Sequence, residues 1–203
     1  SSAPYAAVED LLNQAQTAQS DSEFASDLAR AQEYLDNSQY DQCAAMLDTL
    51  DADDTLTEDQ KSQVADLREQ LTEAQESAQR QEESQQQQSE QKQTFSDRID
   101  KLEENDLQIA SAATTEDELA LTASSFEQWD SLLMDMYDYL STILNADQYA
   151  SEEASFQQWV EERDSGAENA AEGASDDTAA QLASYSFRQS YTKARCYRLL
   201  DMM

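Results

Sequence analysis

Apolar residues recur at intervals of three and four along most of this chain, which is the spacing of one face of an α-helix. The first stripes predict helices from Pro4 to about residue 18, from about 22 to 36, and from about 39 to 50. Ser20 to Ser22 is interpreted as a break with capping residues, and Asn37-Ser38 as a turn. The amino-terminal part is therefore predicted to consist of helical hairpins.

A fourth helix is predicted after Thr57, because Gln60 stands three residues later and completes a capping box. Its apolar stripe continues to Ala78. Residues 22–78 resemble a tetratricopeptide-like helical hairpin. One such unit buries little surface alone. It could act as a spacer, pack on the first helix or dock a partner, and we favour the spacer.

Apolar residues disappear between Gln79 and Gln93, where Gln, Glu and Ser dominate. The stretch is either an exposed helix or a flexible linker, and the absence of Gly and Pro favours the helix. We place the domain boundary here. The expected organisation is a helical hairpin region over 1–78, the Gln/Glu-rich segment 79–93, and a helical domain over 94–203.

The carboxy-terminal part is predicted to hold four helices. One starts near Thr94 or Ser96. A second is expected to follow a capping box of Thr115 and Glu118 and to run to about residue 144. After a connection over 145–150, the last two are expected over about 151–170 and 178–202, with a short break over 173–177. Short connections between amphipathic helices indicate a four-helix bundle-like domain.

Composition supports an all-α fold, since the 203 residues include only two Gly and one Pro. A formal net charge of −32 argues against nucleic acid and against an anionic membrane surface, because neither meets a basic patch. A cationic protein would be attracted instead. The same charge also simply keeps a protein soluble.

No catalytic or metal-binding pattern is present in the sequence. His is absent, and Cys43 and Cys196 lie far apart without metal-ligand spacing. We therefore expect buried cysteines, no cofactor, no metal and no enzymatic activity. No transmembrane run is visible, and the start Ser1-Ser2-Ala3-Pro4 suggests a chain trimmed behind an export signal.

The strongest polar pattern is Trp159-x-x-x-Arg163-Asp164, which puts the indole and the guanidinium on one helix face. A buried Arg needs a carboxylate partner. Arg163, Asp164 and Arg195 come from two helices that we expect to pack together, with Asp130 as a further partner. The first interpretation is a polar clamp inside the bundle that contacts nothing external.

Three motifs together resemble the LprI-like lysozyme-inhibitor family of secreted or lipid-anchored bacterial domains. They are Trp129-Asp130 before Leu133 and Tyr137; the segment with Trp159, Arg163 and Asp164; and Thr192, Arg195 and Leu199. The match covers about the last third of the chain. Many members carry a cysteine where this chain has Ala167, so this would be a cysteine-free, divergent member.

The resemblance implies an exported binding protein that inhibits lysozyme or a related cationic cell-wall hydrolase. The alternative is a structural or adaptor lipoprotein at the bacterial cell surface with a tetratricopeptide-like spacer and no inhibitory activity. A polar coiled-coil assembly ranks third, because strict heptads are not sustained. We therefore expect a monomer.

Overall fold

The computed structural model describes residues 3–203, and its regular elements are six α-helices and one short 3-10 turn, with no strand in that range. The all-α prediction is confirmed. Ser1 and Ser2, which belong to the expected export-trimmed start, lie outside the described residues. The helices are α1 (Ala3–Asp36), α2 (Tyr40–Asp51), α3 (Glu58–Asp106), α4 (Thr115–Ile143), α5 (Ala146–Ala171) and α6 (Asp177–Met202), with η1 (Ile109–Ser111) between α3 and α4.

The helices form two compact units, an N-terminal unit that ends at Gln85 and a C-terminal unit from Gln86 to Met203. Each unit has its own buried core. The helix α3 is shared, since its first half belongs to the N-terminal unit and its second half to the C-terminal unit.

A new helix does not begin near Thr94 or Ser96, so that prediction is wrong. The stretch 79–93 is helical throughout, and residues 79–87 are all exposed. Three glutamines brace it by hydrogen bonds to carboxylates one turn later, at 2.7–2.8 Å: Gln79 to Glu83, Gln86 to Glu90, and Gln93 to Asp97. Good helix formers without Gly or Pro let the helix continue.

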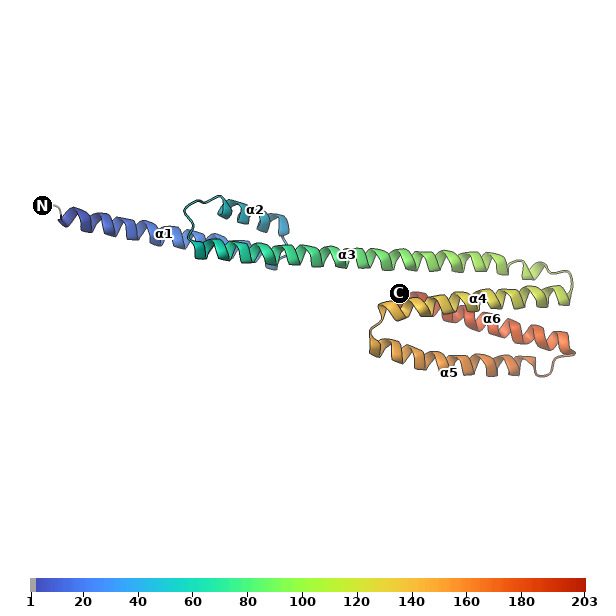
Figure 1. Cartoon of the computed structure of the whole chain (residues 1–203). Coiled ribbons are helices and arrows are strands. Elements are labelled where there is room, and N and C mark those ends of the chain that lie inside the picture. The colour runs from blue at the N-terminus through green and yellow to red at the C-terminus, as the bar shows by residue number, and fades with distance from the viewer. Residues whose placement is uncertain (1–2) are drawn as a thin grey trace. The chain divides into compact units, whose positions relative to one another are not determined.

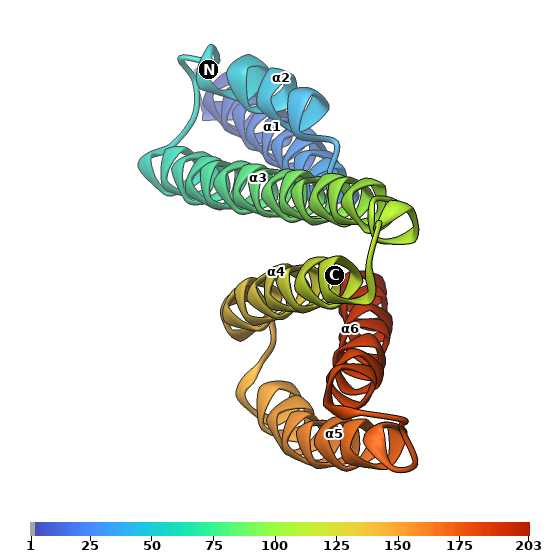
Figure 2. The same cartoon turned by 90° about the vertical axis from the view of Figure 1, so that its right-hand side faces the viewer.

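In the N-terminal unit, α1, α2 and the start of α3 lie side by side (Figures 1 and 2). Their core consists of Phe24, Ala31, Cys43, Leu47, Leu50, Leu56, Val64, Leu67 and Leu71. The chain turns after α1 at Ser38, whose φ of 58° is left-handed. The capping box is confirmed, because the Thr57 N–H donates to Gln60 Oε1 at 2.9 Å and the Gln60 N–H to Thr57 Oγ1 at 3.3 Å.

The expected break at Ser20 to Ser22 is wrong, since α1 runs from Ala3 to Asp36 without interruption. Ser and Asp can cap a helix, but they do not end one in the way that Gly or Pro does. Within a sequence of good helix formers, a capping residue therefore allows a helix to start but does not force the preceding helix to end.

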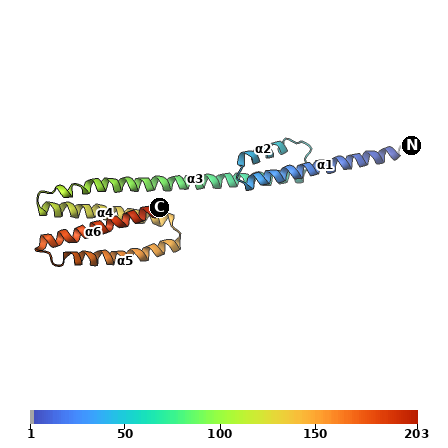
Figure 3. The same cartoon turned by 180° about the vertical axis from the view of Figure 1, so that it is seen from behind.

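In the C-terminal unit, the second half of α3 packs on α4 and α6 lies between α4 and α5 (Figure 3). Four helices thus build one packed arrangement, as predicted. The core consists of Phe95, Ile99, Trp129, Leu132, Leu133, Met136, Tyr137, Leu140, Trp159, Cys196 and Leu199.

Two helices of this unit begin at other residues than predicted. The cap of α4 is Thr114, not Thr115, and its hydroxyl accepts from the Asp117 N–H at 3.1 Å. The predicted connection over 145–150 is mostly helix, because Asn145 and Gln148 form a capping box that starts α5 at Ala146. An extended backbone conformation at each cap aims the side chain at the free N–H groups, and the sequence pattern does not reveal which Thr adopts it.

Among residues 3–203, no helix combines the length and the apolar character needed to cross a membrane.

Candidate functional site

The residues singled out from the sequence lie together in the C-terminal unit. The helix α4 supplies Trp129, Asp130, Leu133 and Tyr137; α5 supplies Trp159, Arg163 and Asp164; and α6 supplies Thr192, Arg195 and Leu199. All are buried except Asp130, Arg163 and Asp164, which are partly exposed. The three segments therefore form one polar and aromatic interior.

Arg163 pairs with the two carboxylates expected for it. Its Nη1 lies 2.9 Å from Asp130 Oδ1, and its Nε lies 3.1 Å from Asp164 Oδ1. The Arg163 side chain is 13% exposed, and its guanidinium lies over two rings, with its Cζ 5.0 Å from the Trp159 centroid and 5.6 Å from that of Phe126. Pairing and stacking together hold this cation in place.

Arg195 pairs with a residue that the sequence analysis missed. Its Nη2 lies 2.5 Å from Oε1 of Glu152, and both side chains are 5% exposed. The Tyr137 hydroxyl donates to the same Glu152 oxygen at 2.9 Å and accepts from Arg195 Nε at 2.8 Å. Burial raises the pKa of Tyr137 well above its ordinary value, so the hydroxyl stays protonated and can donate.

A second cation meets the same carboxylate from the surface. Arg198 Nη2 lies 2.8 Å from Glu152 Oε2, and the Ser155 hydroxyl lies within 3.3 Å of both Arg195 and Arg198. Glu152 stands seven residues before Trp159, which places both on the inner face of α5. That spacing was the signal available in the sequence.

Trp159 lies near both arginines, since its ring centroid is also 5.8 Å from the Cζ of Arg195. Its ring stacks between Phe156 and Tyr191, each at a centroid distance of 5.7 Å. The row continues from Tyr191 to Phe187 at 5.4 Å. The expected polar clamp is therefore two arginine clusters that both contact one aromatic row.

Gly166 lets this row close, because a Cβ at position 166 would overlap the ring of Phe187. The glycine sits within α5, where its helix propensity is poor. Its position is explained by the close approach of α6 and not by a turn.

Thr192 does not join either cluster. Its hydroxyl is buried, and within residues 3–203 it has no hydrogen-bond partner. Trp129 instead donates its indole N–H to Asp106 Oδ2 at 3.0 Å, and Asp106 also accepts from the Ser125 hydroxyl. Asp106, at the end of α3, is the second residue that the sequence analysis missed.

Both cysteines are buried and unpaired, as expected. Burial, with a smaller contribution from the charge of Asp130, raises the pKa of Cys196 to about 12, which disfavours a thiolate nucleophile. The described residues contain no group of three or more Cys, Asp or Glu side chains arranged to hold a metal ion.

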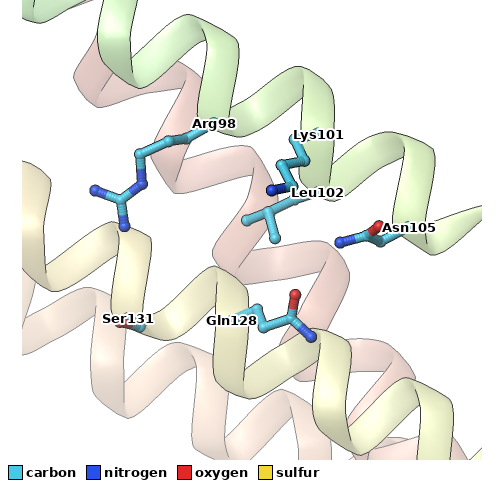
Figure 4. Close-up of a pocket in the computed structure, with 6 residues that line it drawn as sticks. All are labelled: Arg98, Lys101, Leu102, Asn105, Gln128 and Ser131. Carbon is cyan, nitrogen blue, oxygen red and sulfur yellow. The ribbon is translucent and has the colours of Figure 1, made fainter.

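A groove of about 320 Å³ lies between α3 and α4, and Figure 4 shows its lining residues: Arg98, Lys101, Leu102, Asn105, Gln128 and Ser131. Arg98 forms an ion pair with Asp135, with 2.7 Å between Arg98 Nη2 and Asp135 Oδ2. Lys101 is exposed and, within the described chain, has no carboxylate at salt-bridge distance. The groove thus offers one ammonium group that is not engaged by a carboxylate of the described chain.

Comparison with known proteins found no matching family model, no matching curated protein and no matching solved structure. The likeness to the LprI-like family therefore stays a sequence-based expectation.

Proposed function

We propose that this chain is a non-enzymatic binding protein whose C-terminal unit takes a cationic protein partner through its exposed carboxylates. The observation that carries the proposal is which charged side chains of the C-terminal unit form ion pairs with one another and which do not. Residues 94–203 contain seven basic and 23 acidic side chains. Six of the basic ones lie at salt-bridge distance from a carboxylate of the same unit.

Those ion pairs engage only six of the 23 carboxylates, namely Glu103, Asp106, Asp130, Asp135, Glu152 and Asp164. Seventeen carboxylates of residues 94–203 are left without such a partner. The arginines among the candidate residues, Arg163 and Arg195, are paired with carboxylates of the unit itself, so a partner meets the acidic exterior. A surface of this kind steers a cationic protein and makes the association rate fall with salt.

The narrower proposal is inhibition of lysozyme or of a related cationic cell-wall hydrolase, at the extracytoplasmic side and with a lipid anchor. It is supported by the three sequence motifs and by the acidic exterior. Lysozyme turnover on cell walls is measured with excess protein at low and at physiological salt. Unchanged turnover at both salt concentrations would contradict the narrower proposal. Equal binding of a cationic protein that is no hydrolase would reduce the broader one to nonspecific attraction.

Charge-matched variants test whether the C-terminal unit supplies the surface. One variant replaces three exposed carboxylates of α5, Glu153, Glu161 and Glu168, by Gln. The control replaces Glu69, Glu73 and Glu83 of α3, which are also exposed and change the net charge by the same amount. At physiological salt the Debye length is about 8 Å, so local charges dominate. The α5 variant should weaken binding more, and an equal loss in both variants counts against the assignment.

A second candidate function is that of a spacer, and the continuity of α3 through 79–93 favours it. Spin labels at Gln79 and Gln93 test it. Fourteen residues of helix span about 21 Å, so a narrow distance distribution near that value is expected. A broad distribution would show a flexible segment and remove this candidate.

A further inference from the structure

The first half of α1 exposes apolar side chains that nothing in the N-terminal unit covers. Tyr5, Val8, Leu11 and Leu12 are 80%, 64%, 65% and 58% exposed, and all residues from 5 to 20 are exposed. This part of α1 extends past α2 and past the start of α3 (Figures 1 and 3). We call Tyr5, Val8, Leu11, Leu12 and Ala15 the amino-terminal stripe.

The amino-terminal stripe is separate from the buried stripe of the same helix. The buried stripe consists of Phe24, Leu28, Ala31 and Leu35, and it packs into the core. Nine residues separate Ala15 from Phe24, which is about 2.5 helical turns. The two stripes therefore lie on opposite sides of α1. Because α2 and α3 cover the buried stripe, the amino-terminal stripe faces away from them and needs a different partner.

A helix of this length without tertiary contacts has little stability of its own. Isolated helices shorter than about 12–15 residues are marginal in water, and most helix stability in proteins comes from packing an apolar face. Continuing from the packed second half of α1 removes the cost of nucleation only. Burying the stripe would supply the missing stability.

We propose that the amino-terminal stripe packs against the same stripe of a second copy of this chain. Residues 5–20 hold only two carboxylates, Glu9 and Asp10, in a chain with 44 acidic residues, and they hold no basic residue. Two copies can meet here without opposing large charges. An anionic lipid surface finds no cation on this segment, and a cationic partner finds few carboxylates. A neutral apolar face fits a copy of itself best.

The spacing of the stripe points to an antiparallel pair. Positions 5, 8, 12 and 15 alternate steps of three and four, which is the seam of a two-helix coiled coil. In an antiparallel register Tyr5 faces Ala15 of the second copy, a large side chain against a small one, and Val8 faces its Leu12. This orientation also places the acidic remainders of the two chains at opposite ends of the contact, which reduces their repulsion. The two helix dipoles are then antiparallel, which is favourable.

The contact is short, so the expected dimer is weak. Two single helices over about eleven residues bury less than the roughly 1,200–2,000 Å² of a standard interface. Dissociation in the micromolar range is therefore expected. This differs from the monomer predicted from sequence, which rested on the absence of sustained heptads over the whole chain. The self-association concerns one short segment only.

Sedimentation equilibrium of the full chain, from micromolar to several hundred micromolar, tests the proposal. A monomer–dimer equilibrium is expected, and higher salt should favour the dimer by screening the net charge. Replacing Val8 and Leu12 by Ala does not lower helix propensity and should weaken dimerisation at least tenfold. The matched control is Leu107→Ala, which removes an isolated side chain that is 74% exposed. Monomer at every concentration, or a dimer indifferent to the Val8 and Leu12 changes, overturns the proposal.

Cysteine cross-linking tests the register, and the two natural cysteines are buried. An equimolar mixture of the variants Tyr5→Cys and Ala15→Cys should form the mixed disulfide dimer on oxidation. Each variant alone should cross-link poorly. Efficient cross-linking of Tyr5→Cys with itself would show a parallel pair and overturn the antiparallel arrangement.

Discussion

Arg195 and Glu152 form an ion pair inside the C-terminal unit, with both side chains 5% exposed and Tyr137 hydrogen-bonded to each. The three residues come from α6, α5 and α4, so one polar cluster joins three helices. Because the two buried charges are satisfied by each other and by the tyrosine, the cluster holds the three helices together.

Replacing Glu152 by Gln should destabilise the C-terminal unit by about 3–5 kcal/mol, because Arg195 keeps its buried charge without a carboxylate. Urea unfolding measures the free energy. The matched control is Asp135→Asn, which breaks the exposed pair with Arg98 and should cost less than about 1 kcal/mol. A Glu152→Gln loss no larger than that of the control would show that the buried pair is not structural.

Replacing Tyr137 by Phe should cost about 1–2 kcal/mol at neutral pH, because the buried hydrogen bonds to Glu152 and Arg195 are lost. The raised pKa of Tyr137 also sets a pH dependence. The folded state binds the phenolic proton more tightly than the unfolded state, whose pKa is near 10.0. This stabilisation is complete below pH 10 and is lost as the pH rises towards the raised value.

Urea unfolding of wild type and Tyr137→Phe between pH 8 and about pH 11.5 measures this dependence. The stability difference between the two proteins should shrink above pH 10, since the variant lacks the titrating group. A difference that stays constant over this range would mean that Tyr137 ionises with an ordinary pKa in both states.

Replacing Gly166 by Ala should destabilise the unit, because the added methyl group overpacks against Phe187 at a cost of about 1–3 kcal/mol. The higher helix propensity of Ala offsets about 1 kcal/mol of this cost. Thermal unfolding is the measurement. Ser165→Ala is the control, since Ser165 is exposed in the same helix. Adding Phe187→Leu should recover part of the loss, and no recovery would place the strain elsewhere.

Replacing Arg163 by Lys should cost about 1–2 kcal/mol, although the charge is kept. An ammonium group cannot span Asp130 and Asp164 in the way that the guanidinium does, and it stacks less well on Trp159. The control is Arg80→Lys, in the exposed pair with Glu76, where little change is expected. If the two variants unfold alike, the fork geometry of Arg163 contributes nothing.

The positions of helix ends show where sequence reasoning succeeded and failed. The capping box at Thr57 was recognisable because both partners stand at fixed spacing. Ser20 to Ser22 and Thr94 carried the same kind of residue, and the helices run through both. A capping residue permits a helix start, and only the surrounding contacts decide whether one occurs.

The ion pairs inside the C-terminal unit were likewise predicted only in part. Asp130 and Asp164 were predicted as partners of Arg163, since Asp164 is its neighbour and Asp130 belongs to the same motif set. The partner of Arg195 was not identified. Glu152 is one of 44 acidic residues, and its burial follows from the rotation of α5 against α6.

The sequence by itself determined that this protein is helical, strongly acidic and free of histidine, because these properties follow from composition and from periodicity along one chain. The tertiary structure alone decided which carboxylates meet Arg195, why Gly166 stands inside a helix, and that the amino-terminal stripe of α1 is left uncovered. Each of these depends on how one helix is rotated and placed against another, and side-chain packing sets that rotation through contacts between residues far apart in sequence.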